Sequence, residues 1–279
     1  MNSPTSVPST PETVGQAKRR PDEAPVVLVT GGAQRIGRAI GLELAAAGWR
    51  VAVHYRHSSA EAARLIEELD DPRMRERGGC RAFGADLADE IQCRALVPNV
   101  RRAMGRLDAL VNNASLFEHD GAADFSFSNM ERHWRTNTGA PLLLSQALHA
   151  GGGQVVVNVL DQKLWNLNPD HLSYTLSKAA LEVATRMLAM AFAPRTRVCG
   201  VAPGITLTST EMSPAEFAAA HRMTPLQRGA QPEDIARAVR YLIEAPAVTG
   251  TTLLVDGGQH LSGQARDVVF LARGAAQPH

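Results

Sequence analysis

The chain has 279 residues, of which 44% are hydrophobic and 20% are charged, and these proportions are typical of a globular protein and exclude wholesale disorder. Lys and Arg number 29 against 28 Asp and Glu, a net charge of +1, which excludes the strongly basic surface of a nucleic-acid-binding protein. No apolar run reaches the ~20 residues of a membrane helix, and three scattered cysteines, Cys80, Cys93 and Cys199, indicate reduced thiols in a cytoplasmic protein without a metal site.

Residues 1–24 differ in composition from the rest of the chain. They are rich in Pro, Ser and Thr, contain the basic triplet Lys18-Arg19-Arg20 and lack the hydrophobic stretch of a secretory signal. We expect a disordered leader whose basic triplet is solvated, with a contact site as the alternative. Residues 25–262 are expected to form one domain, and residues 263–279 a C-terminal tail of uncertain structure.

From residue 26 onward, apolar strand-like runs alternate with helical patterns. The runs are continuous Val, Leu and Ala segments, as expected when helices cover both faces of a parallel sheet. Strands are predicted at 26–29, 51–53, 81–83, 107–111, 154–159, 197–201 and 252–255. Helices are predicted at 36–47, 60–69, 89–104, 129–149, 172–193 and 232–244. The pattern predicts an α/β fold: one doubly wound parallel sheet of about seven strands with helices on both faces.

A glycine-rich turn follows the first predicted strand. Its sequence, Thr30-Gly31-Gly32-Ala33-Gln34-Arg35-Ile36-Gly37, opens the first helix. Glycine permits a positive φ and lets a diphosphate approach backbone N–H groups, and the start of a helix attracts anions. Such turns also close ordinary strand–helix units. At the head of an alternating chain, however, this turn predicts a dinucleotide site with Gly31, Arg35, Ile36 and Gly37 as cofactor contacts.

The end of the second strand indicates which dinucleotide is bound. An NAD-selective site usually has Asp or Glu there to hold the ribose 2′-hydroxyl, but this segment reads His54-Tyr55-Arg56-His57-Ser58. Arg35 and Arg56, with His57 and Ser58, are suited to bind a 2′-phosphate through charge-assisted hydrogen bonds. The alternative is that Arg56 and His57 lie in a solvated loop. We predict NADPH as the cofactor and place this whole segment near it.

Two further segments end strands on the expected cofactor side. Asp86-Leu87 follows the third strand, and Asn113-Ala114-Ser115 follows the fourth. Small and amide residues at these positions leave room for a ligand in the crevice at the carboxyl ends of the strands. Each segment alone is also compatible with a plain turn. Because both segments follow strands on the same side of the sheet as the glycine-rich turn, we predict both as cofactor contacts.

A Tyr–Lys pair lies in the helical pattern that starts near residue 172. Tyr174 and Lys178 are four residues apart and therefore share one helical face. Together with the glycine-rich turn, Asn137, Pro203-Gly204 and Asp256-Gly257-Gly258, this pair makes the chain from about residue 26 to 261 resemble the short-chain dehydrogenase/reductase family. The resemblance implies a Rossmann-like reductase domain, a homotetramer built through the helices near 129 and 172, and Pro203-Gly204 as further cofactor contacts.

The resemblance also implies roles for the polar residues. A free tyrosine titrates near ~10, too high for efficient acid–base catalysis at neutral pH. Lys178 and an oxidised nicotinamide would favour the Tyr174 phenolate. Lys178 would also hold the nicotinamide ribose, while Asn137 would anchor a water that connects Lys178 to solvent. By this interpretation Tyr174 is the proton donor.

Residue 161 departs from the common pattern of the family. Most members have a serine thirteen residues before the tyrosine to bind a substrate carbonyl, and this chain has Asp161. An ionised carboxylate there would repel a phenolate and a developing oxyanion, so it is poorly suited to a simple ketone. It is suited to a substrate with basic ring nitrogens, to which a protonated carboxyl can supply a proton.

This substitution resembles the pteridine reductase subgroup, which includes the dihydromonapterin reductases. The Arg35 turn, the segment 54–58 (with Arg56 and His57 in swapped order) and Phe117 also match that subgroup. By this resemblance Phe117 stacks on the pterin, Ser115 contacts it, and Asp161 and Tyr174 bind it. The alternatives are that Phe117 is ordinary core and that Asp161 marks an inactive homologue.

We therefore predict an NADPH-dependent reductase that transfers hydride to a pterin. The first alternative is a 3-oxoacyl-thioester or small-carbonyl reductase that uses the same Tyr–Lys pair, for which serine is expected at position 161. The second is a protein that binds NADP(H) without turnover, against which the intact Asn137, Tyr174 and Lys178 argue. Residues 205–223, where the family has its substrate loop, show no obvious specificity residue, and the sequence does not fix the exact pterin.

Overall fold

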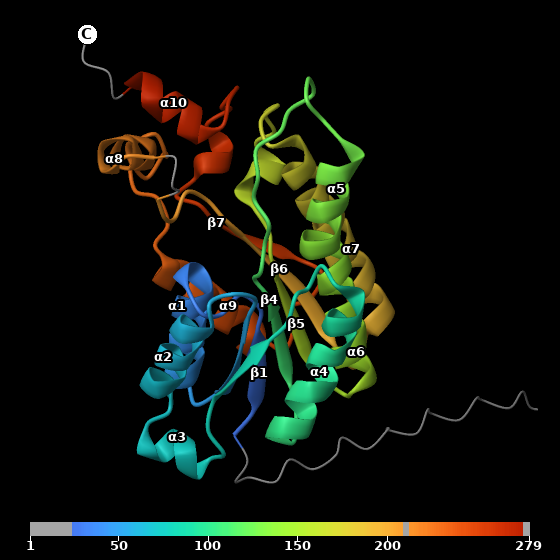
Figure 1. Cartoon of the computed structure of the whole chain (residues 1–279). Coiled ribbons are helices and arrows are strands. Elements are labelled where there is room, and N and C mark those ends of the chain that lie inside the picture. Colours follow the sequence, from blue (N-terminus) through green and yellow to red (C-terminus); the bar gives the residue numbers. More distant parts are fainter. Residues whose placement is uncertain (1–23, 209–211, 276–279) are drawn as a thin grey trace, which may run out of the picture.

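A computed structural model of the chain describes residues 24–208 and 212–275, so the expected leader, apart from Ala24, lies outside the described residues. Seven strands form one sheet in the order β3-β2-β1-β4-β5-β6-β7, and every pair is parallel (Figure 1). The predicted doubly wound sheet is confirmed. The strands are β1 (Val26–Val29), β2 (Arg50–Tyr55), β3 (Arg81–Gly84), β4 (Ala109–Asn112), β5 (Val155–Val159), β6 (Arg197–Pro203) and β7 (Thr252–Val255).

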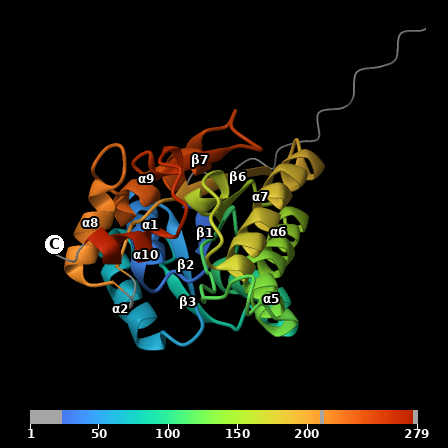
Figure 2. The same ribbon diagram turned by 90° about the horizontal axis from the view of Figure 1, so that it is seen from above.

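Helices cover both faces of the sheet. One face carries α1 (Arg35–Ala46), α2 (Ser59–Leu69) and α9 (Pro232–Glu244), and the other carries α4 (Glu90–Met104), α6 (Ala140–Ala150) and α7 (Leu172–Phe192) (Figures 1 and 2). Successive strand residues point to opposite faces. In β1, Val27 and Val29 join the core under α1 and α9, while Val26 and Leu28 join the core under α4 and α6. All four are fully buried, which explains why the strand is an uninterrupted apolar run.

The chain order reverses between β1 and β4, which are neighbours in the sheet. In a doubly wound sheet the loops at this point diverge to opposite faces and leave a crevice outside the carboxyl ends of the strands. The glycine-rich turn after β1 and the segment Asn113–Phe117 after β4 border that crevice. The fold therefore places the predicted cofactor residues at one edge of the sheet.

The predicted helix at 129–149 is three elements in the structure. An α-helix, α5 (Phe127–Trp134), continues into a π-helical turn, Arg135–Gly139, and then into α6. Pro141 gives the physical reason, since it has no N–H to donate to the carbonyl four residues earlier, which belongs to Asn137. Single-turn π segments inside helices often occur at functional sites.

Three short α-helices were not predicted, α3 (Pro72–Glu76), α8 (Pro214–Arg222) and α10 (Val268–Ala275), nor were the 3₁₀-helices Gln162–Trp165 and Gln259–Leu261. Helices α8 and α10 pack against each other beyond the carboxyl ends of the strands (Figures 1 and 2), around the buried residues Met212, Ala220, Val268, Val269 and Ala272. Much of the expected C-terminal tail is therefore folded over the site. Within the described residues, no helix is both long enough and apolar enough to cross a membrane.

Candidate active site

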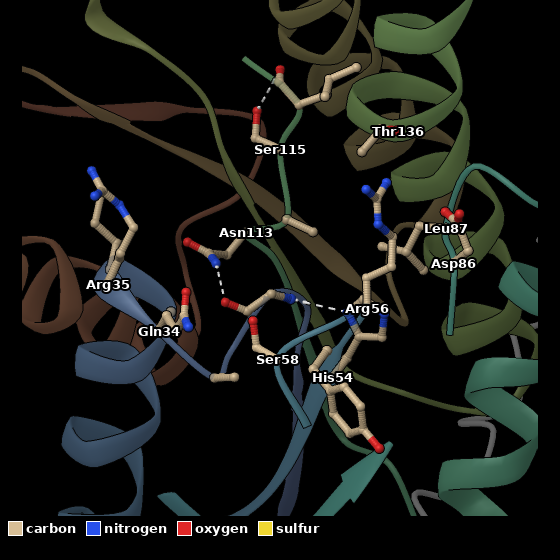
Figure 3. A pocket seen from close by; sticks show the side chains of 17 residues that line it. Gln34, Arg35, His54, Arg56, Ser58, Asp86, Leu87, Asn113, Ser115 and Thr136 are labelled. Carbon is tan, nitrogen blue, oxygen red and sulfur yellow. Dashed lines mark hydrogen bonds between the residues drawn. The ribbon is translucent and has the colours of Figure 1, made fainter. Parts of the chain in front are cut away.

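A cleft of about 410 Å³ opens at the carboxyl ends of β1 to β4 (Figure 3). It is lined by nearly all of the residues predicted to contact the cofactor around the glycine-rich turn: Gly31, Arg35, Ile36, Gly37, His54, Tyr55, Arg56, Ser58, Asp86, Leu87, Asn113, Ala114 and Ser115. His57 is not among its lining residues. The sequence did not single out Ala33, Gln34, Leu116 and Thr136, which also line it.

The glycine-rich turn needs glycine for steric reasons, most clearly at Gly31 and Gly37. Gly31 has φ +59°, a left-handed backbone conformation that residues other than glycine rarely adopt. A Cβ on Gly37 would lie 2.2 Å from the Gly31 carbonyl oxygen, so only glycine lets the turn pack against the start of α1. The backbone is thereby left open to a phosphate at a helix N-terminus, and the cleft fits a dinucleotide.

His54 supports this turn rather than facing the cleft with a free ring nitrogen. The Gly31 amide donates to His54 Nδ1 at 3.1 Å, and His54 Nε2 lies 3.0 Å from the Ala85 carbonyl oxygen. The partners require a neutral ring that carries its proton on Nε2. Burial lowers the pKa of His54, which favours this neutral form. His54 therefore links the end of β2 to the turn after β1.

The two candidate arginines for a 2′-phosphate lie on different sides of the cleft (Figure 3). Arg56 is beside Ser58, and its Nε donates to His57 Nε2 at 2.7 Å in an exposed position. Both terminal nitrogens of Arg35 lie 3.2 Å from the backbone oxygen of Thr208. The structure does not bring Arg35 to Arg56. Sequence proximity to the cofactor turn could not show that the Arg35 side chain extends toward the loop after β6.

A second cavity of about 340 Å³ adjoins the cleft and shares Arg35, Ile36, Asn113 and Ser115 with it. It is bordered by the ends of β5 and β6, by the start of α7 and, in the C-terminal segment, by Gln264, Asp267, Val268 and Val269. The predicted residues in its wall are Phe117, Asp161, Tyr174, Lys178, Pro203 and Gly204. The cofactor and substrate residues expected from the sequence thus meet at one place.

Asp161 and Tyr174 form the polar centre of this second cavity. The Tyr174 hydroxyl donates to Asp161 Oδ2 at 2.6 Å, and the Lys163 amide donates to Asp161 Oδ1 at 2.9 Å. Burial raises the pKa of Asp161 above its ordinary value. Burial and the charge of Asp161 raise the pKa of Tyr174 well above its ordinary value. The pair therefore retains protons that an exposed carboxyl and phenol would release more readily.

Lys178 lies behind Tyr174 on α7 and is almost completely buried. Its ammonium donates to the Val159 carbonyl oxygen at 2.8 Å and lies 5.9 Å from the centre of the Tyr174 ring. Burial lowers the pKa of Lys178 to about 8, although the charge of Asp161 acts in the opposite direction. The three groups are thus electrostatically coupled in one buried cluster.

Asn137 lies in the π-helical turn and does not line either cavity. Its Oδ1 accepts from the Leu116 amide at 2.7 Å and from Ser115 Oγ at 3.3 Å. Its Nδ2 donates to the Leu116 carbonyl oxygen at 2.9 Å and to Ser177 Oγ at 3.0 Å. The side chain therefore uses its full hydrogen-bonding capacity. Pro141 has no N–H to donate to the Asn137 backbone carbonyl, so the predicted water contact stays a prediction for that backbone oxygen.

Phe117 stands at the wall of the second cavity and is 49% exposed, so it is not ordinary core. One side of its ring stacks on His171, with centroids 4.3 Å apart and planes at 28°. It also makes a T-shaped contact with the Tyr174 ring, with centroids 4.7 Å apart and planes at 87°. These contacts hold an aromatic surface next to the Tyr174 hydroxyl.

Several residues of the second cavity were not found from the sequence, among them Lys163, Asn168, Gln259, Gln264, Asp267, Val268 and Val269. Most belong to the C-terminal segment or to the turn after β5, where the sequence has no strand pattern or long helical pattern from which their positions could be predicted. One signal was present. Only three of the 29 basic residues are lysines, and the two described ones, Lys163 and Lys178, both line this cavity.

Residues 31–260 match the family model described as "Enoyl-(Acyl carrier protein) reductase". A protein of Streptomyces violaceoruber named as a candidate ketoacyl reductase of the granaticin polyketide synthase is 34% identical over 254 residues, covering 86% of this chain and 97% of that protein. Pteridine reductase 1 of Leishmania tarentolae is 30% identical over 281 residues, covering 86% of this chain and 97% of that protein.

Three solved structures are similar to this chain over most of its length. FolM alternative dihydrofolate reductase 1 from Brucella suis, solved in complex with NADP, is 39% identical with a TM-score of 0.80, covering 88% of this chain and 98% of that chain. The Brucella canis protein of the same name, also complexed with NADP, is 38% identical with a TM-score of 0.78 and covers 87% and 96%. A blue fluorescent protein from a metagenomic library, in complex with NADPH, is 31% identical with a TM-score of 0.75, covering 85% and 98%.

Proposed function

Because this chain belongs to the short-chain dehydrogenase/reductase family, we propose that it uses NADPH to reduce a pteridine, a dihydropterin of the biopterin or monapterin kind. The single observation that carries the proposal is the 2.6 Å hydrogen bond between Tyr174 and Asp161 in the wall of the second cavity. It supports the proposal because a carboxyl with a raised pKa in the cavity wall is suited to give a proton to a ring nitrogen of the substrate. Phe117 adds an exposed aromatic face for a flat ring.

NADPH supplies the hydride when it is bound, and NADP or NADPH is present in the three solved relatives. Most of the residues that would hold it line the first cleft. The turn at Gly31 and Gly37 and the start of α1 favour the diphosphate. Arg56 and Ser58 favour a 2′-phosphate, and no acidic side chain competes with them in the segment 54–58. Lys178 would bind the nicotinamide ribose.

The reduction breaks a C=N π bond, with the hydride added to the ring carbon and a proton added to the ring nitrogen. Burial keeps a proton on the Asp161–Tyr174 pair up to a higher pH than in water. In this interpretation the Asp161 carboxyl gives its proton to the nitrogen. Tyr174, which is hydrogen-bonded to the same carboxyl, is the adjacent proton store, and a positioned acid of this kind contributes about 10²–10⁴-fold to rate.

The second candidate function is reduction of a ketone or 3-oxoacyl thioester, the activity that the name of the Streptomyces relative suggests. The Tyr174 and Lys178 pair is compatible with it. Asp161 fits it less well than serine does, because in its ionised form the carboxylate would lie beside the oxyanion that develops on a reduced carbonyl. A third candidate, binding of NADP(H) without turnover, would leave the complete Asn137, Tyr174 and Lys178 set without a purpose.

We also propose that the enzyme is a cytoplasmic homotetramer assembled through α5 and α7. Large apolar side chains are exposed on α7, with Leu176 46%, Val183 47%, Met187 60% and Met190 74% exposed, and Phe127 at the start of α5 is 87% exposed. Apolar patches of this kind mark contact surfaces in soluble proteins. Light scattering on the purified chain measures its oligomeric state, and a monomer at micromolar concentration would rule out the homotetramer.

The function is tested by following NADPH oxidation with a panel of substrates. We expect turnover with dihydrobiopterin or dihydromonapterin, and the panel should include dihydrofolate to define the range. A small ketone and a 3-oxoacyl thioester are the comparison substrates. Good turnover of either of these, with none of any pterin, would refute the proposal in favour of the second candidate. Tight NADPH binding without any turnover would favour the third.

A further inference from the structure

A second acidic side chain, Asp267, lies in the wall of the substrate cavity and belongs to the C-terminal segment that precedes α10. Its side chain is 16% exposed, and its Oδ2 lies 3.3 Å from the ammonium of Lys163. Its Oδ1 accepts from the Val269 amide at 3.2 Å, which holds the carboxylate in place at the start of the helix. A carboxylate held by two partners has a fixed position beside the site.

Lys163 joins this segment to Asp161. Its backbone amide holds Asp161 Oδ1 at 2.9 Å, while its ammonium, 4% exposed, donates to the Asp170 carbonyl oxygen at 2.5 Å and pairs with Asp267. A buried lysine is costly unless it is fully paired. The chain uses arginine for almost every other cation, and the compact ammonium is the cation that fits a closed position of this kind.

The neighbouring residue fastens the segment on its outer side. Arg266 binds both oxygens of Asp170, at 3.1 and 2.9 Å from its Nε, and the Asp267 amide donates to Asp170 Oδ2 at 2.7 Å. Neither Arg266 nor Asp170 lines the cavity. The two consecutive residues 266 and 267 therefore do different things: one holds the segment from outside, and the other faces the site.

We propose that Lys163 and Asp267 are a pair of positioning residues, through which the docked C-terminal segment sets the electrostatic environment of Asp161. The inference rests on the proposed function only in treating Asp161 as the acid of the reaction. The charged and titratable groups that face Asp161 are Tyr174 and Lys178 from α7 and Asp267 from the C-terminal segment. The negative charge of Asp267 acts to raise the pKa of both Asp161 and Tyr174.

Asp267 itself is faced by other charges, and these give the sign of each substitution. Lys163 and Arg266 are its cationic neighbours, and its charge acts to raise the pKa of His171. Removing the Asp267 carboxylate takes a negative charge away from Asp161, so its proton is released at lower pH. Removing the Lys163 ammonium leaves that negative charge uncompensated, so the proton is released at higher pH.

The test is a carbon-13 NMR titration of the Asp161 carboxyl in the full chain saturated with NADP⁺, with the resonance assigned by Asp161→Asn. We expect Asp267→Asn to move the titration midpoint of Asp161 down by up to about one pH unit, and Lys163→Met to move it up. Arg266→Gln is the matched control on the adjacent residue: it removes a cation that is bound to Asp170 outside the cavity, so it should not move the midpoint down as Asp267→Asn does. Opposite shifts from the two members of one pair are not produced by a merely structural role.

An unchanged midpoint in Asp267→Asn, or an equal shift in Arg266→Gln, would overturn the inference. Should Lys163→Met fail to fold, the titration midpoints of Asp161 in Asp267→Asn and Arg266→Gln still test whether Asp267 acts on Asp161. The readout needs no turnover, so it is separable from the proposed function. A chain that shows the shifts but reduces no dihydropterin would refute only the function, and a dihydropterin reductase without the shifts would refute only this inference.

Discussion

Replacing Asp161 by serine gives the residue that most family members have at this position, and it removes the group on which the proposed chemistry depends. The substitution deletes the carboxyl that accepts from Tyr174 at 2.6 Å and the candidate proton donor to the substrate. A positioned acid contributes about 10²–10⁴-fold, which at 1.36 kcal/mol for each factor of ten corresponds to about 3–5 kcal/mol of transition-state stabilisation. We expect kcat/KM for a dihydropterin to fall by that factor.

NADPH binding should be unchanged in Asp161→Ser, because Asp161 is not among the residues that line the cofactor cleft. Removing the charge that raises the pKa of Tyr174 should also make the phenol a better proton donor to a carbonyl. The assay is steady-state NADPH oxidation with a dihydropterin and with a ketone, together with fluorescence titration of NADPH. Asp161→Asn is the control, since it keeps the shape but has neither the acid nor the serine hydroxyl. Equal losses in pterin turnover and NADPH affinity would refute the reasoning.

Three further predictions concern the cofactor, the stacking surface and pH. Arg56→Ala should weaken NADPH binding by about 10–100-fold, as expected for loss of 1.5–3 kcal/mol of charge-assisted hydrogen bonding, and leave NADH affinity unchanged; isothermal titration with both cofactors measures this, and equal losses would contradict it. Phe117→Ala should raise KM for a dihydropterin by about 2–10-fold, the equivalent of 0.5–1.5 kcal/mol of stacking, with unfolding unaltered because the ring is 49% exposed; an unchanged KM would exclude the stacking role. Burial lowers the pKa of His54 and His171 in the folded chain, so as the pH falls the unfolded state binds protons at these residues first. The free energy of unfolding should therefore fall as the pH drops below about 6.5. Urea unfolding between pH 7.5 and 5.5 should show a smaller fall in His54→Gln than in the unchanged chain, and an identical fall would contradict a buried neutral His54.

The sequence was sufficient to predict the sheet because its strands are buried on both faces. Val26 to Val29 form a continuous apolar run because alternate residues enter two different cores. The Tyr174 and Lys178 pair was also predictable, since four residues make about one helical turn whatever the tertiary structure. Local periodicity decides features of this kind.

Features that depend on tertiary contacts were not predictable. The side chain of Arg35 is next to the cofactor turn in sequence, but it reaches the Thr208 carbonyl oxygen on another loop. His54 was expected as a cofactor contact, and its partners Gly31 and Ala85 belong to two other segments. The pairing of Lys163 with Asp267 joins residues 104 positions apart. Sequence spacing carries no information about such contacts.

The most direct test of the central claim is a crystal structure of the chain with NADP⁺ and a pterin analogue. The account predicts that a ring nitrogen of the pterin lies within hydrogen-bonding distance of the Asp161 carboxyl and that the pterin ring stacks on Phe117. A pterin bound elsewhere, or one whose nearest atom to Asp161 is a carbon, would contradict it.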